Sequence, residues 1–132
     1  VGLMIAIKLF KALIIAMTIA IANASFATEN HTKSFIFFYS SSCEYCHEMA
    51  DILVKIRQKH KIRIIANSLD GKKIEQFPNA LHDNKITTKF KIVSIPTIVA
   101  VDSEKKQFEV ITVGLESEAM IEAKILAWIN NA

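Results

Sequence analysis

The sequence is poor in cysteine, glycine and proline, with two, three and two of these residues in a chain of 132. Two cysteines are too few for a small scaffold held together by disulfides and for a four-cysteine zinc site. So few glycines and prolines exclude a collagen-like chain and a low-complexity linker. The length is that of one domain. We therefore expect a single globular domain rather than a repeat, a linker or a stapled miniprotein.

Acidic residues are absent from the start of the chain, where the first is Glu29. The formal net charge is +3, from 16 lysines and arginines against 13 acids, but two of these cations lie in the first eleven residues. Without residues 1–27 the balance is 14 cations to 13 acids, a net charge of +1. Binding of nucleic acid through phosphate contacts needs a larger excess of positive charge. We therefore expect no nucleic-acid partner.

The first 27 residues have the layout of a secretory signal peptide. Two lysines precede an uncharged apolar run at residues 12–22, and small residues at a spacing of two follow it. Cleavage after Ala24 and cleavage after Ala27 both fit this pattern. The run is short for a membrane span, which needs about 20 apolar residues, and an uncleaved leader that anchors the chain is the alternative. We expect a signal peptide at 1–27 and one exported, periplasmic domain at 28–132.

Apolar patterning predicts an α/β fold in the order βαβ, short helix, ββ, helix. The run at residues 35–39 is apolar on both alternate faces, which is typical of a buried central strand. A helical stripe predicts a helix over 43–60, with Ser42 as its cap. Further strands are expected at 62–67, 97–101 and 108–113, a loop at 68–79, a short helix at 83–91, and a last helix from Ser117 to about 131 with Ile121, Ile125, Trp128 and Ile129 buried.

These elements predict the topology of the sheet. A βαβ unit implies two parallel strands joined by a right-handed crossover. The last two strands flank the short polar stretch 102–107 and therefore form an antiparallel hairpin. We expect a mixed four-stranded sheet with helices on both faces.

The motif Cys43-Glu44-Tyr45-Cys46 follows the predicted central strand and opens the predicted helix. At this spacing the two sulfurs can meet within one helical turn and cycle between dithiol and disulfide. Free N–H groups and the helix dipole at the helix start stabilise the thiolate of Cys43, which is the attacking species, although the anionic Glu44 partly opposes them. A purely structural disulfide is the alternative, but closing so short a loop contributes only on the order of 2 kcal/mol. We predict a redox-active disulfide between Cys43 and Cys46.

His47 extends the motif to Cys-x-x-Cys-His, which also fits the attachment of a c-type haem. Met120, His60 or His82 could supply its second axial ligand. Because c-type cytochromes are mostly helical and four strands are predicted here, we expect no haem and no other cofactor. His47 is then a helix residue that favours a neighbouring thiolate when it is protonated. The other histidines, His31 included, lack metal-ligand spacing, so we predict surface residues and no metal site.

Three segments together resemble the thioredoxin fold: the strand at 35–39, the helix opening with the cysteine motif, and Ser94-Ile95-Pro96-Thr97 before the hairpin. The resemblance covers nearly all of the chain after the leader. Shorter segments are similar to the TraF/TrbB group, exported thioredoxin-like proteins of F-type conjugative transfer systems that take part in pilus assembly. These segments are Phe37-Phe38-Tyr39, Ser68-Leu69-Asp70-Gly71 and Phe77-Pro78.

The resemblance implies roles for particular residues. Cys43 would be the exposed nucleophile and Cys46 the buried resolving thiol. The Ile95–Pro96 bond would be cis, with the Ile95 backbone beside the dithiol and available to pair with the extended chain of a substrate. Phe37 departs from the family pattern, because cytosolic thioredoxins carry a buried acid at this position. That departure favours oxidation or isomerisation over reduction.

A second departure is the length of chain before the central strand. Thioredoxins usually place a strand and a helix there, and only the segment 24–33 is available for them. We therefore expect a trimmed version of the fold.

These observations lead to a hypothesis about function. We expect an exported thiol–disulfide oxidoreductase or isomerase whose partners are extracytoplasmic cysteine-containing proteins, with pilus assembly components among them. A thiol–disulfide partner that the sequence does not identify would reset the dithiol. The alternative is a non-catalytic assembly factor that only uses the fold. The direction of electron flow stays open.

Overall fold

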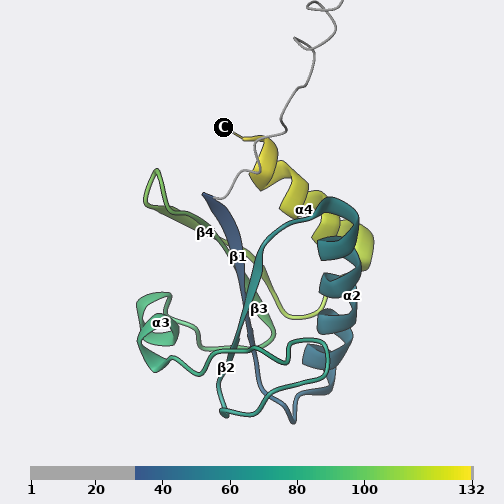
Figure 1. The fold of residues 1–132 in the computed structure, drawn as a ribbon, viewed down its shortest axis with the longest axis vertical. Helices are drawn as coiled ribbons and strands as arrows, with labels where there is room; N and C mark the ends of the chain where they lie inside the picture. Colours follow the sequence, from purple (N-terminus) through teal and green to yellow (C-terminus); the bar gives the residue numbers. More distant parts are fainter. Residues whose placement is uncertain (1–31, 132) are drawn as a thin grey trace, which may run out of the picture.

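The computed structural model describes residues 32–131, so the predicted signal peptide and His31 lie outside the described residues. Within this range the elements are β1 (Lys33–Tyr39), α2 (Glu44–His60), β2 (Ile64–Ser68), α3 (Asn84–Lys89), β3 (Thr97–Asp102), β4 (Gln107–Val113) and α4 (Glu118–Asn130) (Figure 1). The predicted order of elements is confirmed. None of the helices in this range is long and apolar enough to cross a membrane.

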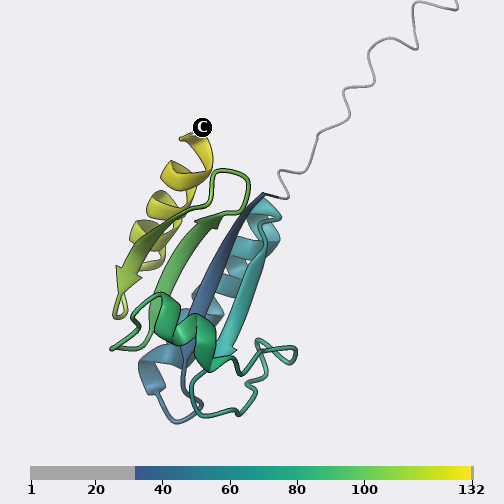
Figure 2. The same ribbon diagram turned by 90° about the vertical axis from the view of Figure 1, so that its left-hand side faces the viewer.

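The four strands form one mixed sheet in the order β2-β1-β3-β4. β1 runs parallel to β2 and antiparallel to β3, and β4 runs antiparallel to β3. Helices α2 and α4 cover one face of the sheet and the short helix α3 covers the other (Figures 1 and 2). This arrangement confirms the mixed four-stranded sheet flanked by helices that the sequence predicts.

β1 lies inside the sheet because its side chains from Phe35 to Tyr39 are all buried. Successive side chains of a strand point to opposite faces. Phe35, Phe37 and Tyr39 therefore enter the main core together with residues of α2 and α4, whereas Ile36 and Phe38 enter a smaller cluster that includes residues of α3. A strand that is apolar on both faces is stable only where both faces are covered, and that requirement places β1 in the middle.

α2 begins at Glu44, and Cys43 is its N-cap. The backbone of Cys43 is extended, and its sulfur accepts a hydrogen bond from the backbone nitrogen of Cys46 at 3.2 Å. The predicted cap, Ser42, is wrong, because the sulfur of Cys43 itself occupies the acceptor position at the helix start. The Ser42 hydroxyl instead lies 3.2 Å from that of Ser40.

α4 begins as predicted, with the Ser117 hydroxyl accepting a hydrogen bond from the backbone nitrogen of Met120. Ile121 and Ile125 are fully buried, which confirms the first half of the predicted stripe. Trp128 and Ile129 are only partly buried, so the second half of the predicted stripe is wrong. Beside Trp128, β4 is the edge strand and no further strand covers the indole.

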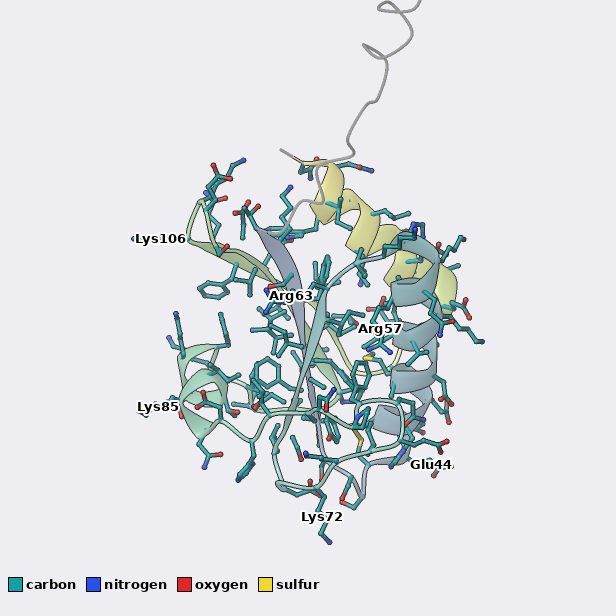
Figure 3. The ribbon with its side chains drawn as sticks, in the orientation of Figure 1. Glu44, Arg57, Arg63, Lys72, Lys85 and Lys106 are labelled. Carbon is teal, nitrogen blue, oxygen red and sulfur yellow. A yellow bond between two sulfur atoms is a disulfide. The ribbon has the colours of Figure 1, made fainter. Side chains whose placement is uncertain are left out.

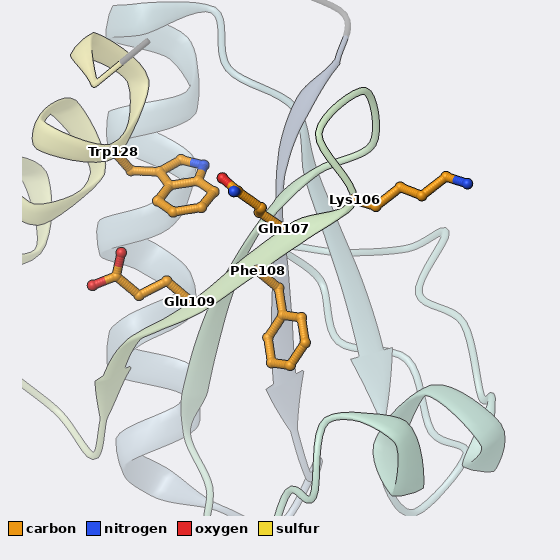
Figure 4. A pocket seen from close by; sticks show the side chains of 5 residues that line it. All are labelled: Lys106, Gln107, Phe108, Glu109 and Trp128. Atoms are coloured by element: carbon orange, nitrogen blue, oxygen red, sulfur yellow. The ribbon is translucent and has the colours of Figure 1, made fainter.

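A hollow of about 410 Å³ lies beside Trp128, between β4 and the end of α4 (Figure 4). Gln107 and Glu109 lie on the α4 side of β4 with the indole, while Phe108 points to the other face (Figure 4). Gln107 pairs with Asp102, which pairs in turn with Lys33 at the start of β1. The hollow is therefore at the opposite end of the sheet from the cysteine motif, which follows the end of β1.

Candidate active site

Cys43 and Cys46 form a disulfide at the start of α2, with their Cα atoms 5.1 Å apart. Cys46 is fully buried in the main core, whereas Cys43 is partly exposed. The two residues between them face solvent: Tyr45 is 63% exposed, and Glu44 points away from the molecule (Figure 3). A large partner can therefore approach the disulfide only from the side of Cys43.

The sulfur of Cys43 lies beside the first turn of α2, at the end where helix N–H groups point outward. The N–H of Cys46 is shared: it donates to this sulfur at 3.2 Å and to the backbone oxygen of Cys43 at 3.1 Å. Because these donors and the helix dipole favour negative charge, they stabilise the Cys43 thiolate relative to the thiol. The geometry thus supplies the local electrostatics that the sequence predicts for this position.

The Ile95–Pro96 peptide bond is cis, as the family resemblance implied. Thr97 pairs with Phe38 near the C-terminal end of β1. Pro96 therefore lies at the end of the sheet where the chain leaves β1 toward Cys43. Ile95 and Cys43 both pack against the main core. The fold therefore brings together two segments that are about 50 residues apart in the sequence.

Next to this edge the chain exposes apolar side chains. Val93, two residues before Ile95, is 95% exposed. The ring of Tyr45, between the two cysteines, is exposed as well.

His47 is bound to the turn that precedes Cys43. Its Nε2 lies 2.7 Å from the backbone oxygen of Ser41, so this nitrogen is the donor. The haem alternative is not supported, because the sulfurs of Cys43 and Cys46 are bonded to each other and the fold is built on a four-stranded sheet.

The other predicted surface histidines differ from each other. His82 is exposed, as predicted, and its Nδ1 is hydrogen bonded to the backbone oxygen of Ser68. His60 is partly exposed, and its Nε2 is paired with Glu122. Neither residue lies near the disulfide in sequence or contacts it.

Asp70 organises the turn before the cysteines, a role that the sequence analysis missed. Its Oδ2 accepts hydrogen bonds from the Ser40 hydroxyl at 3.1 Å and from the backbone nitrogen and hydroxyl of Ser41. Its Oδ1 accepts from the Ser68 hydroxyl and from the backbone nitrogen of Lys72. These bonds, that of the Ser41 hydroxyl above all, hold the pKa of Asp70 well below its ordinary value of 3.8.

A signal for this contact was present in the sequence. Ser40 follows β1, and Asp70 follows β2. Because the carboxyl ends of parallel neighbours meet at one edge of a sheet, polar residues after two such strands can be expected to contact one another.

A family model described as TraF, F plasmid transfer operon protein, matches residues 16–126, which is most of the chain. The chain belongs to the TraF family. This confirms the narrower of the two resemblances found in the sequence. No curated protein matches this TraF family member.

Solved structures share the fold of this TraF family member. Mitochondrial thioredoxin 3 from Saccharomyces cerevisiae in its oxidized form matches with a TM-score of 0.57 and 21% identity, over 73% of this chain and 78% of that one. The thioredoxin from Trypanosoma brucei brucei matches at 0.58 and 15%, over 75% and 76%. MTB dsbF matches at 0.56 and 14%, over 73% and 80%. The fold is thioredoxin-like.

This TraF family member therefore has the architecture of a protein thiol–disulfide oxidoreductase. A disulfide of the Cys-x-x-Cys type lies at a helix start, one of its cysteines is partly exposed, and a cis proline lies at the same end of the sheet. The buried acid of cytosolic thioredoxins is replaced by Phe37, which lies in the main core with Cys46. Among the described residues the buried carboxylate is Asp102, at the other end of β1.

Replacing Asp70 with asparagine is expected to lower the free energy of unfolding at neutral pH. The free energy of unfolding of this variant should also fall less steeply than that of the wild type as the pH is lowered. Because the folded-state pKa of Asp70 lies below the unfolded value, its stabilisation is present above about pH 4 and is lost as the pH falls through the folded pKa. Urea unfolding at several values between about pH 7 and about pH 2 measures this decline. The control is Glu48→Gln, an exposed carboxylate on α2, which should keep the wild-type slope. A decline of the free energy of unfolding in Asp70→Asn as steep as that of the wild type would contradict the expectation.

Proposed function

We propose that the protein is an exported thiol–disulfide oxidoreductase or isomerase, acting on cysteine-containing proteins of conjugative pilus assembly outside the cytosol. The observation that carries the proposal is the asymmetry of the disulfide: the sulfur of Cys43 caps a helix and this residue is partly exposed, while Cys46 is fully buried. Membership of the TraF family and the signal-peptide pattern of residues 1–27 support the cellular setting.

In the reductive direction, the Cys43 thiolate attacks one sulfur of a substrate disulfide. A mixed disulfide forms, and the other substrate sulfur leaves as a thiolate that takes up a proton. Cys46 loses its proton and attacks the Cys43 sulfur, which closes the Cys43–Cys46 disulfide and releases the second substrate thiol. Two electrons have then passed to the substrate. The reverse sequence oxidises a substrate dithiol, and a separate thiol–disulfide partner restores the starting state.

Substrate binding is assigned to the segment around Ile95 and Pro96. This segment lies at the same sheet edge as the disulfide, and the exposed Val93 adjoins it. An extended substrate chain placed along Ile95 would have its cysteine beside Cys43. Apolar residues next to the substrate cysteine would contact Val93 and Tyr45, so the preferred clients are segments exposed before folding is complete.

The surroundings of Cys46 favour oxidation and isomerisation over reduction. When Cys46 attacks a mixed disulfide it must first lose its proton, and a buried carboxylate nearby would accept that proton. Phe37 stands at the position where cytosolic thioredoxins carry such an acid, and its ring packs against Phe77 with centroids 5.6 Å apart. Release of a mixed disulfide by Cys46 is consequently slow, which leaves time for a substrate thiol to attack instead.

Replacing Cys43 with serine is expected to abolish both insulin reduction and the reactivation of scrambled ribonuclease, because no attacking thiolate remains. Cys46→Ser should still attack but should accumulate mixed disulfides, which non-reducing gels separate from free protein. Thermal unfolding of both variants checks that they fold. Turnover at the wild-type level in Cys43→Ser would overturn the mechanism, and a wild-type protein without turnover would leave the fold as a non-catalytic assembly factor.

Expression of Cys46→Ala in cells that assemble a conjugative pilus is expected to trap pilus assembly proteins as mixed disulfides in the periplasmic fraction. The matched control is the double variant Cys43→Ala/Cys46→Ala, which should trap nothing.

Sequencing of the mature N-terminus should find cleavage after Ala24 or Ala27. Recovery of the protein and its clients only in the cytosol would contradict the proposed setting, while leaving the chemistry in place.

A further inference from the structure

We infer that Asp70 and His47 are positioning residues for disulfide exchange at Cys43. They act through the backbone of Ser41 and fix the turn that carries the attacking sulfur. The inference deepens the proposed function and rests on it. It depends on contacts between three segments: the turn after β1, the loop after β2 and the first turns of α2.

The first contact comes from the loop after β2. The N–H of Ser41 donates to Oδ2 of Asp70 at 3.0 Å, and the Ser41 hydroxyl donates to the same oxygen. The carboxylate is itself held in place, because its other oxygen accepts from Ser68 at 2.8 Å and from the backbone nitrogen of Lys72 at 3.1 Å. Hydrogen bonds to an ionised acceptor are stronger than those between neutral groups. Asp70 is therefore a fixed anchor for the Ser41 N–H.

The second contact comes from α2. Nε2 of His47 donates to the backbone oxygen of Ser41 at 2.7 Å. The backbone nitrogen of His47 also donates to the backbone oxygen of Cys43 at 3.3 Å, so the imidazole extends from the same turn that begins at the N-cap. Both backbone polar groups of Ser41 are thus bound by side chains from other segments.

These contacts act on the cysteine pair through a short connection. Ser41 lies two residues before Cys43, and the backbone nitrogen of Cys43 donates to the backbone oxygen of Ser40 at 3.1 Å. The turn is closed by this hydrogen bond. Asp70 binds it to the loop after β2, and His47 binds it to α2. The place of the Cys43 sulfur relative to Cys46 therefore depends on how firmly Ser41 is held.

Two consequences follow for the redox equilibrium. The disulfide is favoured when its two sulfurs are held close together, because closure then costs less entropy. Loosening the turn therefore favours the dithiol. Removing the negative charge of Asp70 acts in the same direction, because a neutral acceptor binds the N–H and hydroxyl of Ser41 more weakly. A residue that only stabilised the fold would change the free energy of unfolding and leave this equilibrium unchanged.

The test measures the equilibrium of the Cys43–Cys46 couple with reduced and oxidised glutathione. Asp70→Asn is expected to shift it about tenfold toward the dithiol, which is about 30 mV for this two-electron couple. Glu48→Gln removes a carboxylate from the exposed face of α2, without a bond to the turn, and should stay within about twofold of the wild type. His47→Leu should shift the equilibrium toward the dithiol, as Asp70→Asn does. His47→Gln should keep the wild-type equilibrium, because its amide nitrogen can donate to the Ser41 oxygen.

The double variant Asp70→Asn/His47→Leu separates a shared action from two independent ones. Since both side chains act on Ser41, the combined shift should be clearly smaller than the product of the single shifts. A full product, or a folded Asp70→Asn protein with the wild-type equilibrium, would overturn the inference. If Asp70→Asn does not fold, the two His47 variants decide, because equal values in His47→Leu and His47→Gln would overturn it as well.

Failure of this inference differs from failure of the proposed function. The glutathione equilibrium needs no protein client, so a wild-type value in every variant would leave protein turnover untouched. Conversely, loss of turnover with protein substrates alone would leave the shifts in place.

Discussion

The site depends on one interaction, the hydrogen bond from the backbone nitrogen of Cys46 to the sulfur of Cys43 at 3.2 Å. It makes the sulfur the cap of α2 and places it beside the N–H groups of the first turn of the helix. A serine or aspartate in that position would only cap the N-terminus of the helix. A cysteine there becomes a thiol whose ionised form the backbone itself stabilises, so the reactive atom and the helix start have the same structural cause.

The central strand explains why the remaining parts of the site lie near that sulfur. Because β1 is apolar on both faces, it must be covered on both sides and paired on both edges. Its parallel neighbour β2 ends at the same end of the sheet and is followed by Asp70. Its antiparallel neighbour β3 begins there and is preceded by the cis proline. Three segments separated in sequence therefore meet around Cys43 as a consequence of one strand's composition.

The elements of the fold could be predicted because each depends on local pattern. The run 35–39 and the helical stripe of Met49 and Leu53 need only neighbours in sequence to be recognised. The cis bond at Pro96 followed from family resemblance alone, since composition and spacing permit an ordinary trans proline. The predicted cap at Ser42 is wrong because the sulfur of Cys43 takes the acceptor position at the helix start. Local pattern places Asp70 only in a loop, since its partners Ser41 and Ser40 lie 29 and 30 residues away.

The most direct test is the pKa of the Cys43 thiol in the reduced protein, from the rate of its alkylation by iodoacetamide as a function of pH. Cys46 is fully buried and should not react. Stabilisation by the helix start predicts a pKa below the value of about 8.5 for a free cysteine. A Cys43 that ionises at about 8.5 would contradict the account, because the helix would then contribute nothing to the chemistry of its cap.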